Sequence, residues 1–184
     1  MAICKALEAD LPQILSIYTH YVTNSTYSFE YAPPSIEVFT QRFQEITQQF
    51  PWLVWEENGQ ILGYAYASTL FSRDAYSWCA QTSVYLRPEV QRKGIGRKLY
   101  KTLENILQQQ GYQVAYAIIT EENKGSVAFH EAMGYHLLAQ FPRCGFKHGK
   151  WLGIIWMEKR LNFVDSPSQK PTNAEVFVNS DRIC

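Results

Sequence analysis

The alternation of strand-like and helix-like segments around one apolar run is the feature that most constrains the fold. Residues 114–119 form that run, a pattern typical of a strand buried on both faces. It follows an amphipathic segment, residues 95–110, which ends at Gly111, a typical helix C-cap. This combination predicts a layered α/β or α+β domain built around one sheet.

The other predicted elements surround this run in the order β-α-α-β-β-β-α-β-α-β-β. Two further helices are expected, at 11–24 and from residue 36 towards Pro51, and a fourth opens at Gly125-Ser126 and ends at Met133-Gly134. Asn58-Gly59 lies between two apolar runs and predicts a tight hairpin. The expected strands are 2–6, 52–56, 61–69, 76–86, 114–119, 135–141 and 151–157.

Length and composition fit one globular domain. The chain has 184 residues and is 46% hydrophobic, which excludes wholesale disorder and falls within the ~100–200 residues of one domain. From Asn162 the sequence is polar and contains two prolines. We therefore expect a domain over residues 1–161 and a polar tail over 162–184.

Charge and motif content exclude several classes of function. The 17 basic and 17 acidic residues cancel, whereas duplex-binding proteins carry a basic excess, so we expect no nucleic-acid partner. No apolar run approaches the ~18 residues of a membrane span, and the start lacks the apolar region of a signal peptide. The four cysteines are scattered and form no CxxC pair, which gives no support for a metal site. A cytoplasmic protein without a membrane or metal partner is expected.

The stretch 87–101 carries the clearest chemical signal. It holds six of the 17 basic residues and only one acid, and it links a predicted strand to a predicted helix. Gly94 and Gly96 allow a tight turn and a close approach to a ligand, and the free N–H groups of a helix start attract anions. The stretch therefore resembles a pyrophosphate cradle, although it matches neither GxxxxGK[ST] nor GxGxxG. On spacing alone, an ordinary turn explains these residues equally well.

Two motifs resemble a known family. Gln91-Arg92-Lys93-Gly94-Ile95-Gly96 is similar to the Q/R-x-x-G-x-G/A motif of the GCN5-related N-acetyltransferases (GNAT), and His130-Glu131-Ala132-Met133-Gly134-Tyr135 is similar to their closing Y-E-K-x-G-F pattern. The resemblance implies acetyl-CoA as co-substrate. It also implies the GNAT fold, a central mixed, largely antiparallel sheet of about seven strands flanked by four helices.

Within that family the sequence most resembles the phosphinothricin and methionine sulfoximine (sulfone) acetyltransferases. The resemblance covers roughly residues 2–160 and implies acetyl transfer to the α-amine of a small amino acid or analogue in a ternary complex, often by a homodimer. The matching pieces are Pro51-Trp52-Leu53-Val54, Ala75-Tyr76 with Trp78, Ser83-Val84-Tyr85, His130-Glu131-Ala132, Gly134-Tyr135 and Gly145-Phe146-Lys147-His148-Gly149.

The resemblance also implies which residues bind the coenzyme. Backbone groups of the strand before the loop hydrogen-bond to it, and we expect the Leu86 N–H to bind the thioester carbonyl oxygen. The peptide N–H groups between Arg92 and Arg97 would grip the diphosphate. The expected coenzyme-binding residues are Val84, Tyr85, Leu86, Arg92, Lys93, Gly94, Ile95, Gly96, Arg97 and Asn123.

His130 and Gln81 occupy the positions implied to be catalytic. His130 stands where many family members carry a tyrosine that protonates the departing thiolate, and histidine exchanges protons near neutral pH. Gln81 stands where the subfamily usually has a glutamate base. Because an amide does not accept a proton at neutral pH, three readings stay open. Gln81 positions a water or the amine, the amine arrives already deprotonated, or catalysis is weak.

The implied substrate residues are Phe29, Arg73 and Tyr76. A guanidinium at Arg73 suits a carboxylate, and the two aromatic side chains match positions that line the substrate site. Phe71 replaces a usual lysine, which argues against a doubly anionic substrate and favours a sulfone, sulfoximine or neutral side chain. Lys147-His148 either approaches this site or caps a hairpin, and the sequence does not decide between these.

Other functions fit parts of the same sequence. Gln81 motivates a non-catalytic acyl-CoA-binding module. A protein or peptide N-acetyltransferase would need an open groove and an acidic patch. Nucleic-acid binding through the basic loop predicts salt-dependent affinity, but a coenzyme loop explains the same charges more economically.

Overall fold

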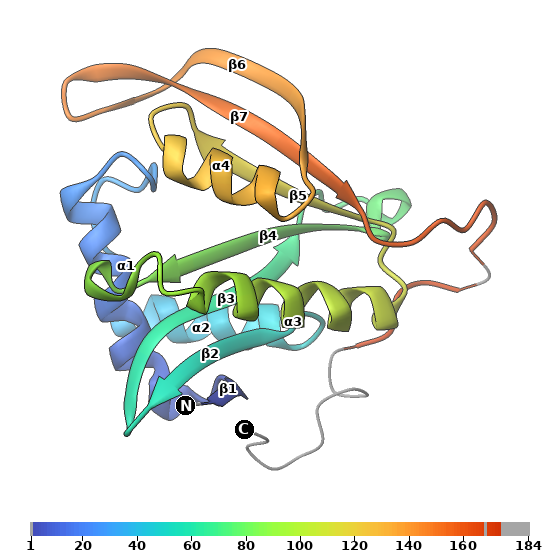
Figure 1. The fold of residues 1–184 in the computed structure, drawn as a ribbon, viewed down its shortest axis with the longest axis horizontal. Coiled ribbons are helices and arrows are strands. Elements are labelled where there is room, and N and C mark those ends of the chain that lie inside the picture. The colour runs from blue at the N-terminus through green and yellow to red at the C-terminus, as the bar shows by residue number, and fades with distance from the viewer. Residues whose placement is uncertain (1, 168, 174–184) are drawn as a thin grey trace.

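Seven strands form one sheet in the spatial order β1-β2-β3-β4-β5-β7-β6. The computed structural model describes residues 2–167 and 169–173, and Figure 1 shows the sheet crossing the centre of the molecule. The predicted fold class is confirmed. The strands are β1 Ala2–Lys5, β2 Trp52–Glu57, β3 Gln60–Thr69, β4 Cys79–Leu86, β5 Val114–Thr120, β6 His136–Lys147 and β7 Lys150–Arg160.

The sheet is mixed because of a single change of direction. Strands β1 to β4 pair antiparallel with one another, and so do β5, β7 and β6. Within the part of the chain that the structure describes, β4 and β5 are the one parallel pair. A parallel pair needs a crossover connection, and helix α3, Ile95–Gln110, provides it.

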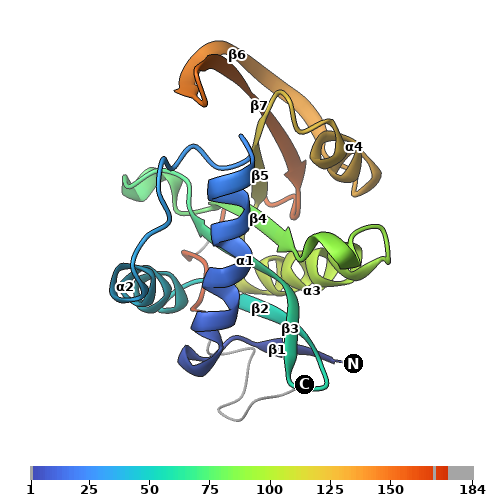
Figure 2. The same cartoon turned by 90° about the vertical axis from the view of Figure 1, so that its left-hand side faces the viewer.

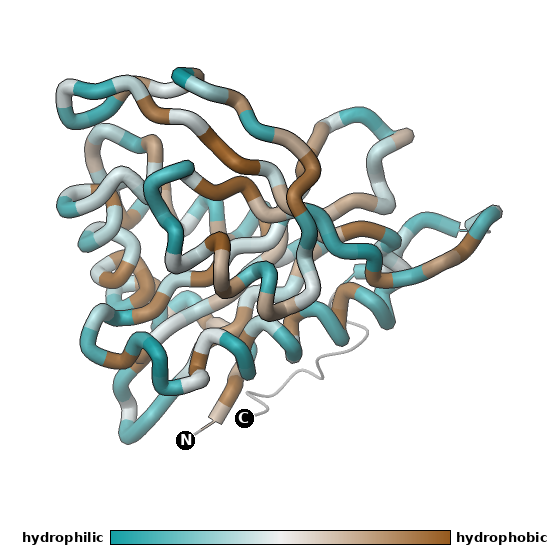
Figure 3. The backbone as a smooth tube through the Cα atoms, turned by 45° about the horizontal axis from the view of Figure 1, so that its top comes forward, coloured by the Kyte–Doolittle hydropathy of each residue, from teal (hydrophilic) through white to brown (hydrophobic). Residues whose placement is uncertain are grey.

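Two helices cover each face of the sheet. Helices α1, Leu11–Asn24, and α2, Ile36–Thr47, pack on one face, while α3 and α4, Lys124–Ala132, pack on the other (Figure 2). Each side has its own cluster of buried apolar side chains. Hydrophobic and hydrophilic residues alternate along the helices in Figure 3, as expected for elements with one face on a core.

The hairpin prediction is confirmed, and several predicted boundaries are wrong. Asn58 and Gly59 both have positive φ, at 52° and 77°, in the turn between β2 and β3. The fourth strand begins at Cys79 rather than at residue 76, because Asp74–Tyr76 forms a 3-10 turn. Helix α4 begins at Lys124, one residue before Gly125, because Asn123 caps it.

Strand β6 extends six residues beyond the predicted end at residue 141. The chain bulges between Phe141 and Gly145, with Arg143 at φ 53°, and then pairs with β7 again up to Lys147. His148 and Gly149 form the turn that joins the two strands, so His148 belongs to a hairpin.

Part of the predicted tail packs against α3. The Thr172 N–H donates to the Gln110 carbonyl (2.9 Å), and the Gln110 amide donates to the Thr172 carbonyl (2.7 Å). Residues 174–184 of that tail lie outside the described residues, and the division at residue 161 stays a prediction. None of the helices over residues 2–167 and 169–173 is long and apolar enough to cross a bilayer.

Candidate active site

A cavity of about 640 Å³ opens where β4 and β5 part. The two strands pair only from Cys79↔Val114 to Gln81↔Tyr116. Beyond that point the two strands no longer pair with each other, and they form opposite walls of the cavity. The walls consist of Thr82–Leu86 and Ala117–Thr120.

The N-terminal ends of two helices close the cavity. Residues from the starts of α3 and α4 line it, among them Gly96, Arg97, Gly125 and Ser126. The first N–H groups of a helix have no partner inside the helix and carry the positive end of its dipole. Two such ends in one cavity favour an anionic ligand.

The loop before α3 has the geometry of an anion cradle. Arg92 and Gly94 both have positive φ, at 62° and 81°, and Gly94 is the N-cap residue of α3. Alternation of this kind turns successive N–H groups towards one side. A Cβ added at Gly94 would meet nothing within 4 Å, so a ligand has open space beside this backbone. Arg92 and Arg97 line the cavity and supply positive charge.

Asn123 closes the second helix start. Its Oδ1 accepts a hydrogen bond from the Ser126 N–H (3.0 Å), and the residue lines the cavity. The Oγ1 of Thr120, at the end of β5, is buried and has no hydrogen-bond partner among the described residues.

Tyr21 holds the outer end of β4 in place. Its hydroxyl donates to the Leu86 carbonyl and accepts from the Gln91 amide (3.0 Å). Burial raises the pKa of Tyr21 above its ordinary value of 10.0, so it stays a donor at neutral pH. This contact uses the carbonyl of Leu86 and not its N–H, so it does not compete with the predicted role of the N–H.

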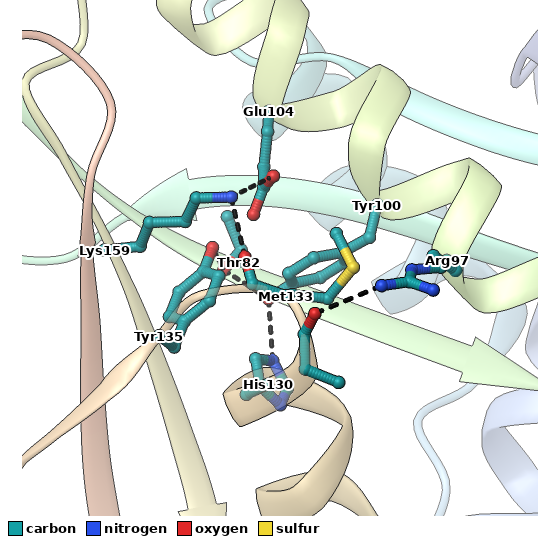
Figure 4. Close-up of polar contacts among 9 residues, drawn as sticks. Thr82, Arg97, Tyr100, Glu104, His130, Met133, Tyr135 and Lys159 are labelled. Atoms are coloured by element: carbon teal, nitrogen blue, oxygen red, sulfur yellow. Dashed lines mark hydrogen bonds and ion pairs between the residues drawn. The ribbon is translucent and has the colours of Figure 1, made fainter.

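His130 belongs to a buried network of polar side chains that begins at the cavity wall. Its Nε2 is 2.8 Å from the Tyr100 hydroxyl, which is in turn 2.6 Å from Thr82 Oγ1 (Figure 4). The Tyr135 hydroxyl lies 3.4 Å from the same Thr82 oxygen. The network therefore joins α4, α3 and β4, and both Thr82 and His130 line the cavity.

The hydrogen bonds fix which ring nitrogen of His130 carries the proton. Nδ1 is 2.7 Å from the Ser126 carbonyl, which can only accept, so Nδ1 bears the hydrogen. Nε2 then accepts from Tyr100. His130 is 3% exposed, and burial lowers its pKa from 6.5 to about 4. The imidazole is thus neutral at pH 7 and does not hold an acidic proton in reserve.

An ion pair lies at the far end of this network. Lys159 Nζ donates to Glu104 Oε2 (2.7 Å) and to the Met133 carbonyl (2.8 Å), which ties β7 to α3 and to the end of α4 (Figure 4). Burial raises the pKa of Glu104, and Lys159 opposes that shift. Arg97 makes a similar link by donating to the Ala132 carbonyl (3.3 Å).

The structure brings most of the predicted coenzyme residues together. Eight of the ten lie in the cavity wall together with His130, whereas Lys93 and Ile95, on either side of Gly94, do not line it. The eight are Val84, Tyr85, Leu86, Arg92, Gly94, Gly96, Arg97 and Asn123.

The predicted acceptor residues lie outside that wall. Gln81 is the last residue of β4 that pairs with β5, and Phe29 packs beside Gly145. Tyr76 is 42% exposed, with its ring 4.8 Å from that of Phe71, and Arg73 precedes the 3-10 turn. These four residues come from β4, from the segment after α1 and from the connection between β3 and β4, and none of them lines the cavity.

Sequence reasoning missed several residues of the site. Tyr27, Thr82, Thr120, Ser126 and Phe129 line the cavity, and Tyr100 and Tyr135 bond behind it. Spacing offered one signal, because Ser126 is four residues before His130 on the same helix face. The contacts of Tyr100 with Thr82 and His130 join distant segments and left no local pattern.

Metal chemistry has no structural support in residues 2–167 and 169–173. No group of three or more His, Cys, Asp or Glu side chains in that part of the chain is arranged to hold an ion.

Comparisons with known proteins define the class. The family model of the acetyltransferase (GNAT) domain matches residues 3–156, and the chain belongs to this family. It is an acetyl-CoA-dependent N-acetyltransferase. It is 34% identical over 162 residues to a phosphinothricin N-acetyltransferase of Streptomyces viridochromogenes, with 88% of each chain covered.

Two further relatives agree with this class. An L-methionine sulfoximine/L-methionine sulfone acetyltransferase of Salmonella typhimurium is 32% identical, with 88% of this chain and 95% of the relative covered. The crystal structure of a phosphinothricin acetyltransferase from Sinorhizobium meliloti in complex with AcCoA is 36% identical. It has a TM-score of 0.85 and covers 93% of this chain and 92% of its own.

Gly94 offers a sharp test of the coenzyme site. We expect Gly94→Asp to raise the Kd for acetyl-CoA at least tenfold over Gly94→Asn, or about 1.4 kcal/mol, because it places a negative charge beside the diphosphate. Asn is the matched control, since it has the same shape and tolerates positive φ. Isothermal titration calorimetry measures both. Equal affinities would contradict a diphosphate at this loop.

The buried His130 predicts a dependence of stability on pH. Its folded pKa of about 4 lies below the unfolded value of 6.5, so the unfolded chain binds the extra proton first. The contribution of His130 to the free energy of unfolding is present above pH 6.5 and is lost as the pH falls towards 4. We expect a loss of about 2 kcal/mol between pH 7 and pH 5 from this group.

Urea denaturation at the two pH values measures that loss. His130→Gln should remove about 2 kcal/mol of the pH dependence, whereas His20→Gln, at an exposed position, should retain it. The same pH dependence in both variants would contradict the burial argument.

Proposed function

We propose that this enzyme acetylates the α-amine of a small amino acid or analogue, of the phosphinothricin or methionine sulfoximine and sulfone type. The observation that carries the proposal is the cavity between the parted strands β4 and β5, with two helix N-termini at it. The relatives named for such acceptors support it. The amine nitrogen would attack the thioester carbonyl in a ternary complex, forming the C–N bond as the C–S bond breaks. The coenzyme leaves as a thiolate, which takes up the proton that the amine nitrogen loses.

In this proposal, different backbone groups of the chain bind different parts of the coenzyme. N–H groups from Arg92 to Arg97, with the Lys93 and Ile95 backbone included, hold the diphosphate. Backbone groups of Val84 and Tyr85 hold the coenzyme's arm, together with Asn123. The Leu86 N–H donates to the carbonyl oxygen as negative charge develops there.

Proton transfer is proposed to involve His130 and Gln81 in different ways. A neutral His130 whose Nε2 accepts from Tyr100 can exchange protons through that hydrogen bond, and its burial argues against a stored acid. Gln81 has an amide that orients the amine or a water without taking a proton. The amine therefore enters deprotonated or loses its proton to water.

The acceptor is proposed to lie against the aromatic side chains on the sheet face next to the cavity. Arg73 would pair with its carboxylate, and Phe29 and Tyr76 would flank its side chain. The Phe71 ring is tilted against that of Tyr76, with centroids 4.8 Å apart, and stacks on that of Trp156, with centroids 6.1 Å apart. An apolar wall here favours an uncharged acceptor side chain over an anionic one.

Release of free thiol from acetyl-CoA tests the function. We expect methionine sulfone and methionine to release thiol faster than phosphinothricin, whose phosphinate would lack a second cation. Phe71→Lys should reverse that order, because it restores the cation. We expect the ratio of kcat/KM for phosphinothricin to kcat/KM for methionine sulfone to rise at least tenfold. Phe71→Leu is the control and should leave the order unchanged.

The same assay separates the rival functions. Acetyl-CoA binding without thiol release across the panel would favour a non-catalytic acyl-CoA-binding module, which Gln81 motivates. Thiol release with peptides and not with free amino acids would instead indicate a protein or peptide N-acetyltransferase.

We further propose a homodimer in the cytoplasm, where acetyl-CoA is available. Strand β6 is an edge of the sheet, and an edge strand with apolar side chains invites pairing. The β6–β7 hairpin exposes several such side chains, at 46–53% of their surface. They are Leu137, Leu138, Phe141, Phe146 and Trp151.

Sedimentation velocity tests the homodimer. We expect the dimer mass for the wild type and a monomer for the double variant Leu137→Glu/Leu138→Glu, since two charges would be buried in the interface. Val38→Glu, which places the same change at an exposed site on α2, is the control. A monomeric wild type at micromolar concentration would contradict the proposal.

A further inference from the structure

Lys147 is a buried cation that the proposed reaction does not use. It ends β6, is 2% exposed, and its Nζ donates to three backbone carbonyls. These are the carbonyls of Val22 (2.7 Å), Ser25 (3.0 Å) and Ser28 (2.8 Å). An ammonium has three donors, so this set satisfies it completely without a carboxylate.

The three carbonyls belong to one short stretch of the chain, from the end of α1 into the segment that follows it. Val22 is within the last four residues of α1, whose carbonyls have no partner inside the helix and carry its negative end. Ser25 and Ser28 lie in the segment that follows. The ammonium therefore holds the end of α1 and the next residues in one fixed conformation.

The two residues before Lys147 contact the same segment. A Cβ at Gly145 would overlap the ring of Phe29, so only glycine allows this ring to lie flat on the strand. The Tyr31 hydroxyl donates to the Phe146 carbonyl (2.6 Å). Three consecutive residues of β6 thus each grip the chain that follows α1, and Figure 2 shows the hairpin beside the end of that helix.

The gripped segment, residues 25–31, reaches the site. Tyr27 lines the cavity and stacks on Tyr21, with ring centroids 6.2 Å apart, and Phe29 is a proposed acceptor residue. Thr26 adds a contact from the other side, since its hydroxyl donates to Glu122 (2.9 Å). The hydrogen bonds from Phe146 and Lys147 go to the end of α1 and to segment 25–31, and none of them goes to the coenzyme loop at residues 91–97. We therefore assign the position of this segment to acceptor binding rather than to diphosphate binding.

We propose that Gly145-Phe146-Lys147 is a clamp that sets segment 25–31 over the acceptor end of the cavity, with Lys147 as its positioning residue. This inference rests on the proposed function, because it assigns the clamp to acceptor binding. It also explains why the strand continues beyond the bulge at Phe141, since only the extended hairpin reaches α1.

Lys147→Met tests the clamp, because methionine keeps the length and removes the three hydrogen bonds. We expect the KM for the amino-acid acceptor to rise at least tenfold, while the Kd for acetyl-CoA changes less than twofold. Lys5→Met is the matched control, on the edge strand at the opposite side of the sheet, and should change neither quantity. An unchanged KM, or a parallel loss of acetyl-CoA affinity, would overturn the inference.

Hydrogen exchange gives a readout that does not depend on turnover. In Lys147→Met the amides of residues 25–31 should exchange at least tenfold faster, with residues 91–97 unchanged. If no acceptor is acetylated, the proposed function fails while this measurement still decides whether the clamp exists.

Tyr31→Phe provides a second variant that should fold normally, because Tyr31 is 75% exposed. It removes one hydrogen bond of the clamp, and we expect a two- to fivefold rise in the acceptor KM and faster exchange of residues 25–31. Wild-type values of both would count against the clamp.

Discussion

The site depends on the point where β4 and β5 stop pairing. Only three residue pairs join them, ending at Gln81↔Tyr116, although both strands run on for several residues. Each strand is held from outside instead, β4 by β3 and β5 by β7, through seven register pairs each. The gap is therefore a rigid feature, and backbone groups at its edges are free for a ligand. Because α3 and α4 both begin there, the positive ends of two helices face the same opening.

Buried polar groups hold the two sides of this opening. On the α3 and α4 side, the chain of hydrogen bonds through Thr82, Tyr100 and His130 links three elements in a low-dielectric interior, where each partner is costly to lose. On the other side, Lys147 organises the residues after α1. Both arrangements satisfy their polar atoms within the protein, so they specify geometry as well as adding stability.

Local pattern predicted the elements better than their ends. The hairpin at Asn58-Gly59 and the cap at Gly111 follow from residues that favour positive φ, and both are present. The predicted strand 135–141 ends too early, because pairing resumes after a bulge that depends on the partner strand β7. Similarly, Tyr76, where the fourth strand is predicted to begin, belongs to a 3-10 turn, and the strand begins at Cys79. Such boundaries depend on contacts with other elements, which local sequence does not encode.

The sequence alone determined the family, the order of the elements and the anion-binding loop, because these depend on residues that are neighbours along the chain. Gly94, Gly96 and the basic residues around them act through local backbone geometry and charge. Only the tertiary structure decided that His130 is neutral, with its proton on Nδ1, and that Lys147 grips the end of α1. Burial and hydrogen-bond partners set both properties, and they come from segments up to 125 residues apart that meet only in the folded chain.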